Sequence, residues 1–197
     1  MEKYLIVKDI VTFILSAVGL YIAGSGLWTW KKQITGKKEF EAAYDLNYAI
    51  LELREAVKHV RHPAIWPSES LSAIQYAKNK YPDKTEDEIG KDSHAYVYEM
   101  RWDKIRETFT KVDAHLLAVE VLWGKEILNL VKPLRKKINE LNIALKQYFQ
   151  PKLMTKDYME IDDIIYGRLD DEENDNFSKS INEYTSKIDE YLKDKIK

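Results

Sequence analysis

The pattern of hydrophobic and polar positions divides the chain into one long apolar segment and a much longer part with helical periodicity. The apolar segment is the stretch 10–30, IVTFILSAVGLYIAGSGLWTW, in which no residue is charged. A helix needs roughly 20 predominantly apolar residues to cross the hydrocarbon core of a bilayer. The pattern therefore predicts a transmembrane helix over residues 10–30, within a membrane anchor formed by residues 1–33.

After the anchor, apolar residues recur at spacings of three and four, which is the period of a helix that packs by one face. This pattern predicts an all-α fold in which residues 34–197 form one helical bundle domain. Its main helices are expected over residues 38–61, 94–123, 125–149 and 175–196. The residues predicted to form the core of the bundle are Leu46, Leu53, Trp102, Phe109, Leu116, Trp123, Leu134 and Leu141.

Two architectures fit the stretch 94–149. In the first, the chain turns back at Gly124, and the four main helices form an antiparallel, up-down-up-down bundle. In the second, residues 94–149 form one long, bent, coiled-coil-like helix with kinks at Gly124 and Pro133. Such a helix would be roughly 84 Å long at about 1.5 Å per residue, about twice the length of the other helices. Matched lengths therefore favour the four-helix bundle.

Three connections are expected between these helices. Residues 34–38 form a short joint after the anchor, with Gly36 as the only helix breaker. Residues 63–92 form a connection that holds one short helix. Residues 150–176 are expected to hold a short apolar helix that covers the end of the bundle, followed by an acidic linker. Asp175 is placed to cap the last helix.

The charges around the apolar segment predict its orientation. Two lysines are balanced by two acids before it, whereas Lys31, Lys32, Lys37 and Lys38 follow it with no acid between them. The flank richer in lysine stays in the cytoplasm, which places the N-terminus outside and residues 34–197 inside. The alternative is a signal peptide cleaved near Ala23-Gly24-Ser25. The apolar run continues past that point, and the charge bias is opposite to that of a signal peptide.

Small residues in the apolar segment follow spacings of four and three and so share one helix face. Small residues on one face let two helices approach closely in lipid, which predicts self-association, although such residues are also common in membrane helices generally. The residues of this small-residue stripe are Thr12, Ser16, Gly19, Ala23 and Gly26. The residues expected to anchor the helix at the membrane interface are Trp28, Trp30, Lys31 and Lys32.

Composition and motifs exclude several chemistries. The chain has no cysteine, which excludes disulfides and thiolate sites, and its net charge of −2 gives no sign of nucleic-acid binding. It contains neither a phosphate-binding glycine loop nor a nucleophile elbow. Glu55, His59 and His62 share a helix face, but their spacing does not match the Glu-x-x-His pairs of di-iron bundles. We therefore expect no catalytic residue, metal, cofactor or small-molecule substrate.

Several sequence phrases occur together: GLWTWKKQ at residues 26–33, VRHP at residues 60–63 and VLWG at residues 121–124. In these phrases the chain resembles a set of small, uncharacterised bacterial proteins with one N-terminal span and a helical cytoplasmic domain. The resemblance covers most of the chain and implies a location in the bacterial inner membrane. It implies no functional residue.

These features lead to two main functional hypotheses and to a weaker third one, an enzyme of unfamiliar type that uses the cavity of the bundle. The first is a membrane-anchored interaction or scaffold module without catalysis, which presents its bundle to another copy of itself or to a protein partner. The alternative is a membrane effector or sensor in a bacterial stress or phage-defence response, whose bundle responds to a signal and alters the bilayer. A scaffold is expected to be inert when overproduced, whereas an effector is expected to impair the membrane.

Overall fold

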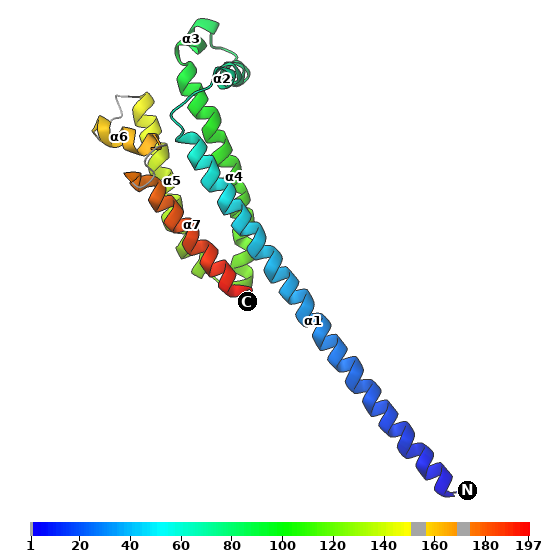
Figure 1. The fold of residues 1–197 in the computed structure, drawn as a ribbon. Coiled ribbons are helices and arrows are strands. Elements are labelled where there is room, and N and C mark those ends of the chain that lie inside the picture. Colours follow the sequence, from blue (N-terminus) through cyan, green and yellow to red (C-terminus); the bar gives the residue numbers. More distant parts are fainter. Residues whose placement is uncertain (1, 151–156, 169–173) are drawn as a thin grey trace.

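The structure is a computed structural model that describes residues 2–150, 157–168 and 174–197; for residues 2–12 it describes the backbone alone. These residues form seven helices and no strand, which confirms the prediction of an all-α fold. One long helix carries the apolar segment, and the others gather around its C-terminal half (Figure 1). We call this gathered part, from residue 38 onward, the helical body.

The first helix, α1 (Glu2–Val60), runs without a break from the apolar segment into the helical body. The expected joint over residues 34–38 is therefore wrong, and α1 also crosses the expected boundary between residues 33 and 34. Gly36 costs a helix about 1 kcal/mol relative to alanine, which is too little to end it among good helix formers. The helix ends where Pro63 disfavours the helical conformation of the residue before it.

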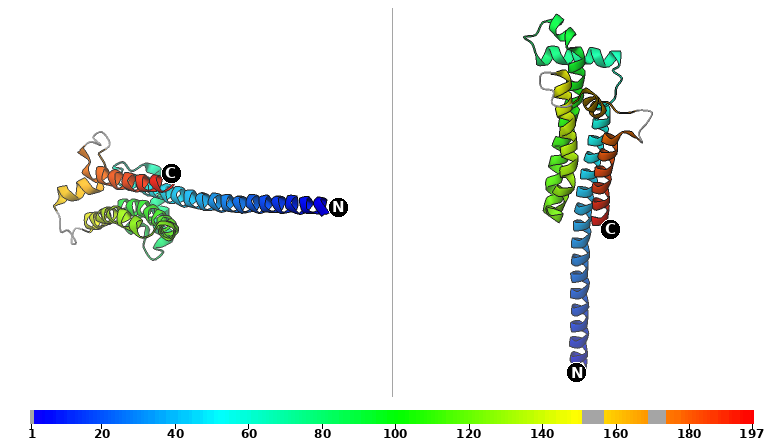
Figure 2. Two further views of the ribbon diagram at one scale, coloured as in Figure 1. Left: turned by 90° about the horizontal axis from the view of Figure 1, so that it is seen from below. Right: turned by 90° about the vertical axis from the view of Figure 1, so that its left-hand side faces the viewer.

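Three further long helices pack against the second half of α1: α4 (Ser93–Trp123), α5 (Glu126–Phe149) and α7 (Asn176–Lys195). Contacts join α1 to α4, α4 to α5, α5 to α7, and α7 back to α1. Successive long helices run in opposite directions, as Figures 1 and 2 show. One continuous hydrophobic cluster lies between them.

The chain turns between α4 and α5 at Gly124, so residues 94–149 are two helices and not one bent helix. Gly124 has a φ of 83°, in the left-handed region that glycine enters without steric cost. Its backbone N–H donates to the carbonyl of Glu120 at 2.8 Å and satisfies one of the last acceptors of α4. Two residues, Gly124 and Lys125, are enough for the reversal.

Two short helices, α2 (Pro67–Lys80) and α3 (Glu86–Lys91), lie at the end of the helical body farthest from the N-terminus (Figure 1). They share a small separate core with the start of α4. Sequence periodicity predicted only the first of them. The second begins at Thr85, whose side chain accepts from the backbone N–H of Glu88 in a capping box.

The helix α6 (Tyr158–Ile165) lies across the same end of α5 and contributes three buried isoleucines to the main core, as the sequence predicted. The following helix, α7, begins at Asp175, whose carboxylate accepts from the backbone N–H of Ser178. This confirms the predicted cap. The acidic stretch 170–173 lies outside the described residues.

Candidate functional site

The small-residue stripe lies on the part of α1 that extends away from the helical body (Figure 2). Ser16, Gly19, Ala23 and Gly26 are exposed, and a Cβ built on either glycine would meet no atom within 4 Å. The side chain of Thr12 lies outside the described part. No other helix of the described part of the chain therefore covers Gly19 or Gly26.

The four residues expected as interfacial anchors lie together at the end of the apolar segment. Trp28 and Trp30 are 67% and 61% exposed, and Lys31 and Lys32 are exposed as well. The Nζ atom of Lys32 lies 5.7 Å from the ring centroid of Trp28, within the range of a cation–π contact. Aromatic rings beside cationic side chains are the composition found at membrane interfaces.

The residues predicted to form the core fall into two groups. Leu46, Leu53, Leu116, Leu134 and Leu141 are buried in the main hydrophobic cluster. Trp102, Phe109 and Trp123 pack against the margin of this cluster and are only partly buried. These three aromatic rings are thus boundary residues of the core.

The exposed side of α1 within the helical body carries a row of aromatic residues that the sequence analysis did not identify. Phe40, Tyr44 and Tyr48 are 55%, 60% and 56% exposed, and their rings follow each other at centroid distances of 6.3 and 6.4 Å. Leu51, 37% exposed, extends the row. We call these four residues the aromatic ladder. Their spacing of four, four and three was visible in the sequence, but the buried face of the same helix gave a stronger pattern.

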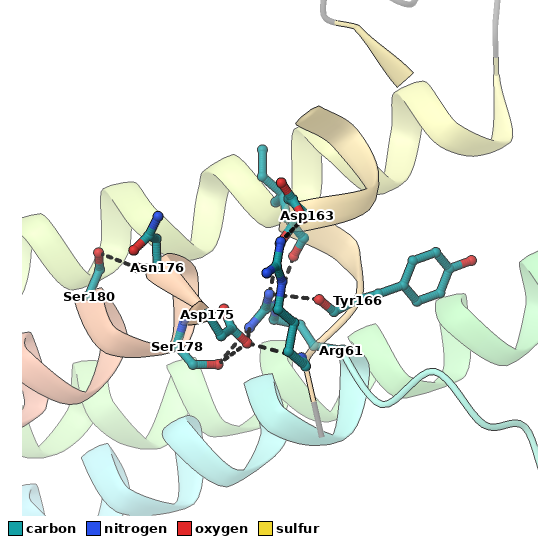
Figure 3. A network of polar contacts seen from close by, with 9 residues as sticks. Arg61, Asp163, Tyr166, Asp175, Asn176, Ser178 and Ser180 are labelled. Atoms are coloured by element: carbon teal, nitrogen blue, oxygen red, sulfur yellow. Dashed lines mark hydrogen bonds and ion pairs between the residues drawn. The ribbon is translucent and has the colours of Figure 1, made fainter. Parts of the chain in front are cut away.

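Arg61, just after α1, is fully buried, which the sequence analysis also missed. Its Nε atom donates to the carbonyl oxygen of Ile164 at 2.7 Å. Its Nη2 atom donates to the carbonyl oxygens of Asp163 and Tyr166 at 2.9 and 3.0 Å (Figure 3). One guanidinium therefore satisfies three backbone acceptors at the end of α6.

The charge of Arg61 is balanced by Asp175, the cap of α7. The Arg61 Nη1 atom donates to Asp175 Oδ2 at 2.8 Å and to Ser178 Oγ at 2.6 Å. The guanidinium also lies 4.5 Å from the ring centroid of Phe177. Burial alone would raise the pKa of Asp175, but hydrogen bonds from Arg61 and Ser178 outweigh it and lower the pKa from 3.8 to about 2. We call Arg61 with these partners the arginine node; it joins α1, α6 and α7.

A second buried arginine, Arg101 of α4, holds the segment that follows α1. It forms a bidentate ion pair with Glu69, with both N–O distances 2.6 Å. It also donates to the carbonyl oxygens of His62 and Ala64 at 2.8 and 2.9 Å. These four hydrogen bonds use four of the five N–H donors of the Arg101 guanidinium, and all of them hold the segment 62–69 against α4.

The histidines examined as metal ligands do not converge. The His59 Nε2 atom lies 3.6 Å from Glu69, whereas His62 Nδ1 lies 3.2 Å from the carbonyl oxygen of Ala64. Glu55 pairs with Arg54 instead. Burial and the positive charge of Arg101 lower the pKa of His59. Among the described residues, no group of three or more His, Cys, Asp or Glu side chains is placed to hold a metal ion.

A hollow of about 630 Å³ lies between α4 and α5 near the end of the helical body farthest from the N-terminus. Tyr98, Trp102 and Phe149 contribute aromatic walls, and Glu99 and Arg106 are among its charged residues. Burial raises the pKa of Tyr98 above its usual value. Tyr81 also lines the hollow, and its hydroxyl donates to Glu99 Oε1 at 2.6 Å, a hydrogen bond that raises the pKa of Tyr81.

Comparison with known proteins finds no matching family model, no similar curated protein and no similar solved structure. The two polar networks are closed and internal. The exposed side of α1, from the apolar segment to the aromatic ladder, carries apolar and aromatic side chains that no other described helix covers.

Proposed function

We propose that the chain is a membrane-anchored helical scaffold, with residues 10–30 spanning the bacterial inner membrane once and the N-terminus outside. In this proposal α1, α4, α5 and α7 form an up-down-up-down four-helix bundle in the cytoplasm. The bundle is held at the membrane and offers a surface to another copy or to a protein partner. No catalytic step is part of the proposal.

One observation supports this proposal above the others: the apolar part of α1 is not covered by the rest of the chain. Among the described residues, one helix is long and apolar enough to cross a membrane, and none of its most apolar stretch is buried. Phe13, Leu20 and Tyr21 are 76%, 76% and 78% exposed. A soluble monomer rarely exposes a contiguous apolar surface of this extent, so lipid or another protein has to cover it.

The topology is tested with single cysteines, because the natural chain has none. Lys3→Cys and Lys197→Cys variants of the full chain are expressed in bacteria and treated with a membrane-impermeant maleimide. The proposal expects labelling of Lys3→Cys in intact cells and of Lys197→Cys only after lysis. It also expects the chain to stay in the membrane after alkaline extraction. Release by alkali, or labelling of Lys197→Cys in intact cells, would contradict it.

Cross-linking of exposed lysines in native membranes, followed by mass spectrometry, then identifies what the scaffold holds. Links between two copies of the chain or links to one different protein are the expected results. A chain that links to nothing at its natural abundance would not be a scaffold.

A second candidate function, a membrane effector or sensor, is favoured by the unbroken course of α1. A continuous helix couples the apolar segment mechanically to the helical body, so that a change in one end reaches the other. Overproduction separates the two proposals. An effector is expected to dissipate the membrane potential or slow growth, and a scaffold is expected to leave both unchanged.

A further inference from the structure

The face of α1 that carries the small-residue stripe continues into the aromatic ladder. At 3.6 residues per turn, about 18 residues make five whole turns of a helix. Gly26 and Tyr44 are 18 residues apart in one unbroken helix, and so are Trp30 and Tyr48. The two surfaces therefore lie on one side of α1, although one lies in the apolar segment and the other in the helical body.

This side is opposite the one that α1 buries in the helical body. Leu53 is fully buried and lies nine residues from Tyr44, which is about two and a half turns and thus the other side of the helix. No helix of the described chain covers the ladder, whose aromatic rings are each more than half exposed. The ladder continues into a hollow of about 460 Å³ lined by Tyr48, Leu51 and Ala56, among others.

The charges beside the ladder favour an uncharged partner surface. The acidic side chains next to it are already in ion pairs within the chain, which leaves little net charge along this face. These pairs are Glu41 with Lys37, Glu52 with Lys111, and Glu55 with Arg54. A strongly basic or acidic partner would find no complementary field, whereas a second neutral aromatic face would bring no unpaired charge into the contact.

We propose that two copies of the chain pack side by side and parallel along this face of α1. The stripe is in contact within the membrane, and the ladder is in contact above it. The inference rests on the proposed function because it takes residues 10–30 as a membrane span. Two copies that cross one membrane in the same orientation lie parallel to each other. A twofold axis between them then brings the same face of each copy into contact.

The size of the ladder explains why both parts of the face are needed. Three aromatic side chains of about 200 Å², each a little more than half exposed, offer about 350 Å² per copy. Two copies would bury about 700 Å² there, below the roughly 1,200 Å² of a small stable interface. The ladder alone is thus too small, and close packing in the span has to supply the rest. Confinement to one membrane also raises the effective concentration of the second contact.

The test uses single cysteines in the full chain, oxidised in native membranes and separated on non-reducing gels. Tyr44→Cys and Lys37→Cys are seven residues apart and lie on the proposed face, since seven residues make about two turns. Thr35→Cys is the matched control, because it is exposed on the same helix nine residues from Tyr44 and so on the opposite side. We expect disulfide-linked dimers at Lys37→Cys and Tyr44→Cys, forming at least about tenfold faster than at Thr35→Cys.

A second variant separates the two parts of the face. Adding Gly19→Leu and Ala23→Leu to the Tyr44→Cys chain is expected to lower the rate of dimer formation by about tenfold, because larger side chains keep the helices apart. Equal rates at Thr35→Cys and Tyr44→Cys, or no dimer at either Lys37→Cys or Tyr44→Cys, would overturn the inference. If the chain is membrane-bound and links to another protein, the scaffold proposal survives while this inference fails. A chain released by alkali would defeat the scaffold proposal itself.

Discussion

Replacement of Asp175 by asparagine should show how much the arginine node stabilises the fold. Asp175→Asn keeps the shape of the side chain and its capping oxygen but removes the charge that balances Arg61. The neutral amide resembles the protonated acid, so the pKa of Asp175 predicts the cost. The pKa is lowered from 3.8 to about 2, and each unit of pKa corresponds to about 1.4 kcal/mol. The expected loss of unfolding free energy at neutral pH is therefore about 2.5 kcal/mol.

The same argument predicts how this cost changes with pH. The pKa of Asp175 is lower in the folded chain than in the unfolded chain, so the ionised carboxylate stabilises the fold above about pH 4. This contribution is lost as the pH falls from 3.8 toward 2, because the folded chain then also takes up the proton. The natural chain and Asp175→Asn should thus differ by about 2.5 kcal/mol at pH 7 and approach each other near pH 2.

The assay is urea unfolding of the full chain in a non-ionic detergent, followed by tryptophan fluorescence over a series of pH values. Asp113→Asn is the matched control, because Asp113 forms an ion pair with Arg135 in which both side chains are substantially exposed. An exposed pair contributes about 1 kcal/mol or less. The reasoning would be refuted if Asp175→Asn cost no more than Asp113→Asn, or if its cost were the same at pH 7 and at pH 3.

Three further substitutions and one control test other parts of the structure by the same unfolding measurement or by amide exchange. Gly124→Ala should cost about 1–2 kcal/mol, because an L side chain is strained at a φ of 83°. Gly90→Ala, inside α3 with open space around it, should not destabilise, and equal costs would contradict the strain argument. Thr85→Ala should cost about 1 kcal/mol and speed amide exchange in α3; unchanged exchange would exclude a role for the cap. Glu69→Gln should cost about 3 kcal/mol by leaving buried Arg101 without its carboxylate, and a cost below about 1 kcal/mol would contradict this.

The long helices were predictable because each depends on local spacing. The four-three alternation of apolar residues gave α4 and α5 to within two residues of their bounds, since packing by one face requires that period. The choice at Gly124 between a turn and a kink depended on helix length, a property of the whole fold. The small-residue stripe was visible for the same reason, but its relation to the aromatic ladder depends on α1 being unbroken. The sequence did not indicate that relation, because the joint expected at Gly36 would have separated the stripe and the ladder into two helices.

The buried arginines were not predictable from local spacing, because their partners are remote in sequence. Arg61 binds Asp175, which lies 114 residues further along the chain. A weak signal existed, since Arg61 is four residues after Val57 and so extends the buried face of α1. Arginine is rarely buried unless paired, so spacing alone does not indicate that this side chain is buried. The capping box at Thr85 was not predicted either, although its signal was local, because both of its residues lie within one turn.

The arginine node determines what the unbroken course of α1 can do. Arg61 follows α1 directly and binds carbonyl oxygens at the end of α6 together with the cap of α7. A rotation of α1 about its axis would therefore pull one buried guanidinium away from acceptors on two other elements at once. Unpaired buried charge is costly, so we expect α1 and the helical body to turn as one unit. In the proposed membrane-anchored chain, a contact that α1 makes within the membrane then also determines which side of the helical body faces a neighbouring copy. A scaffold needs only this fixed relation, whereas an effector needs a second state in which Arg61 exchanges its partners.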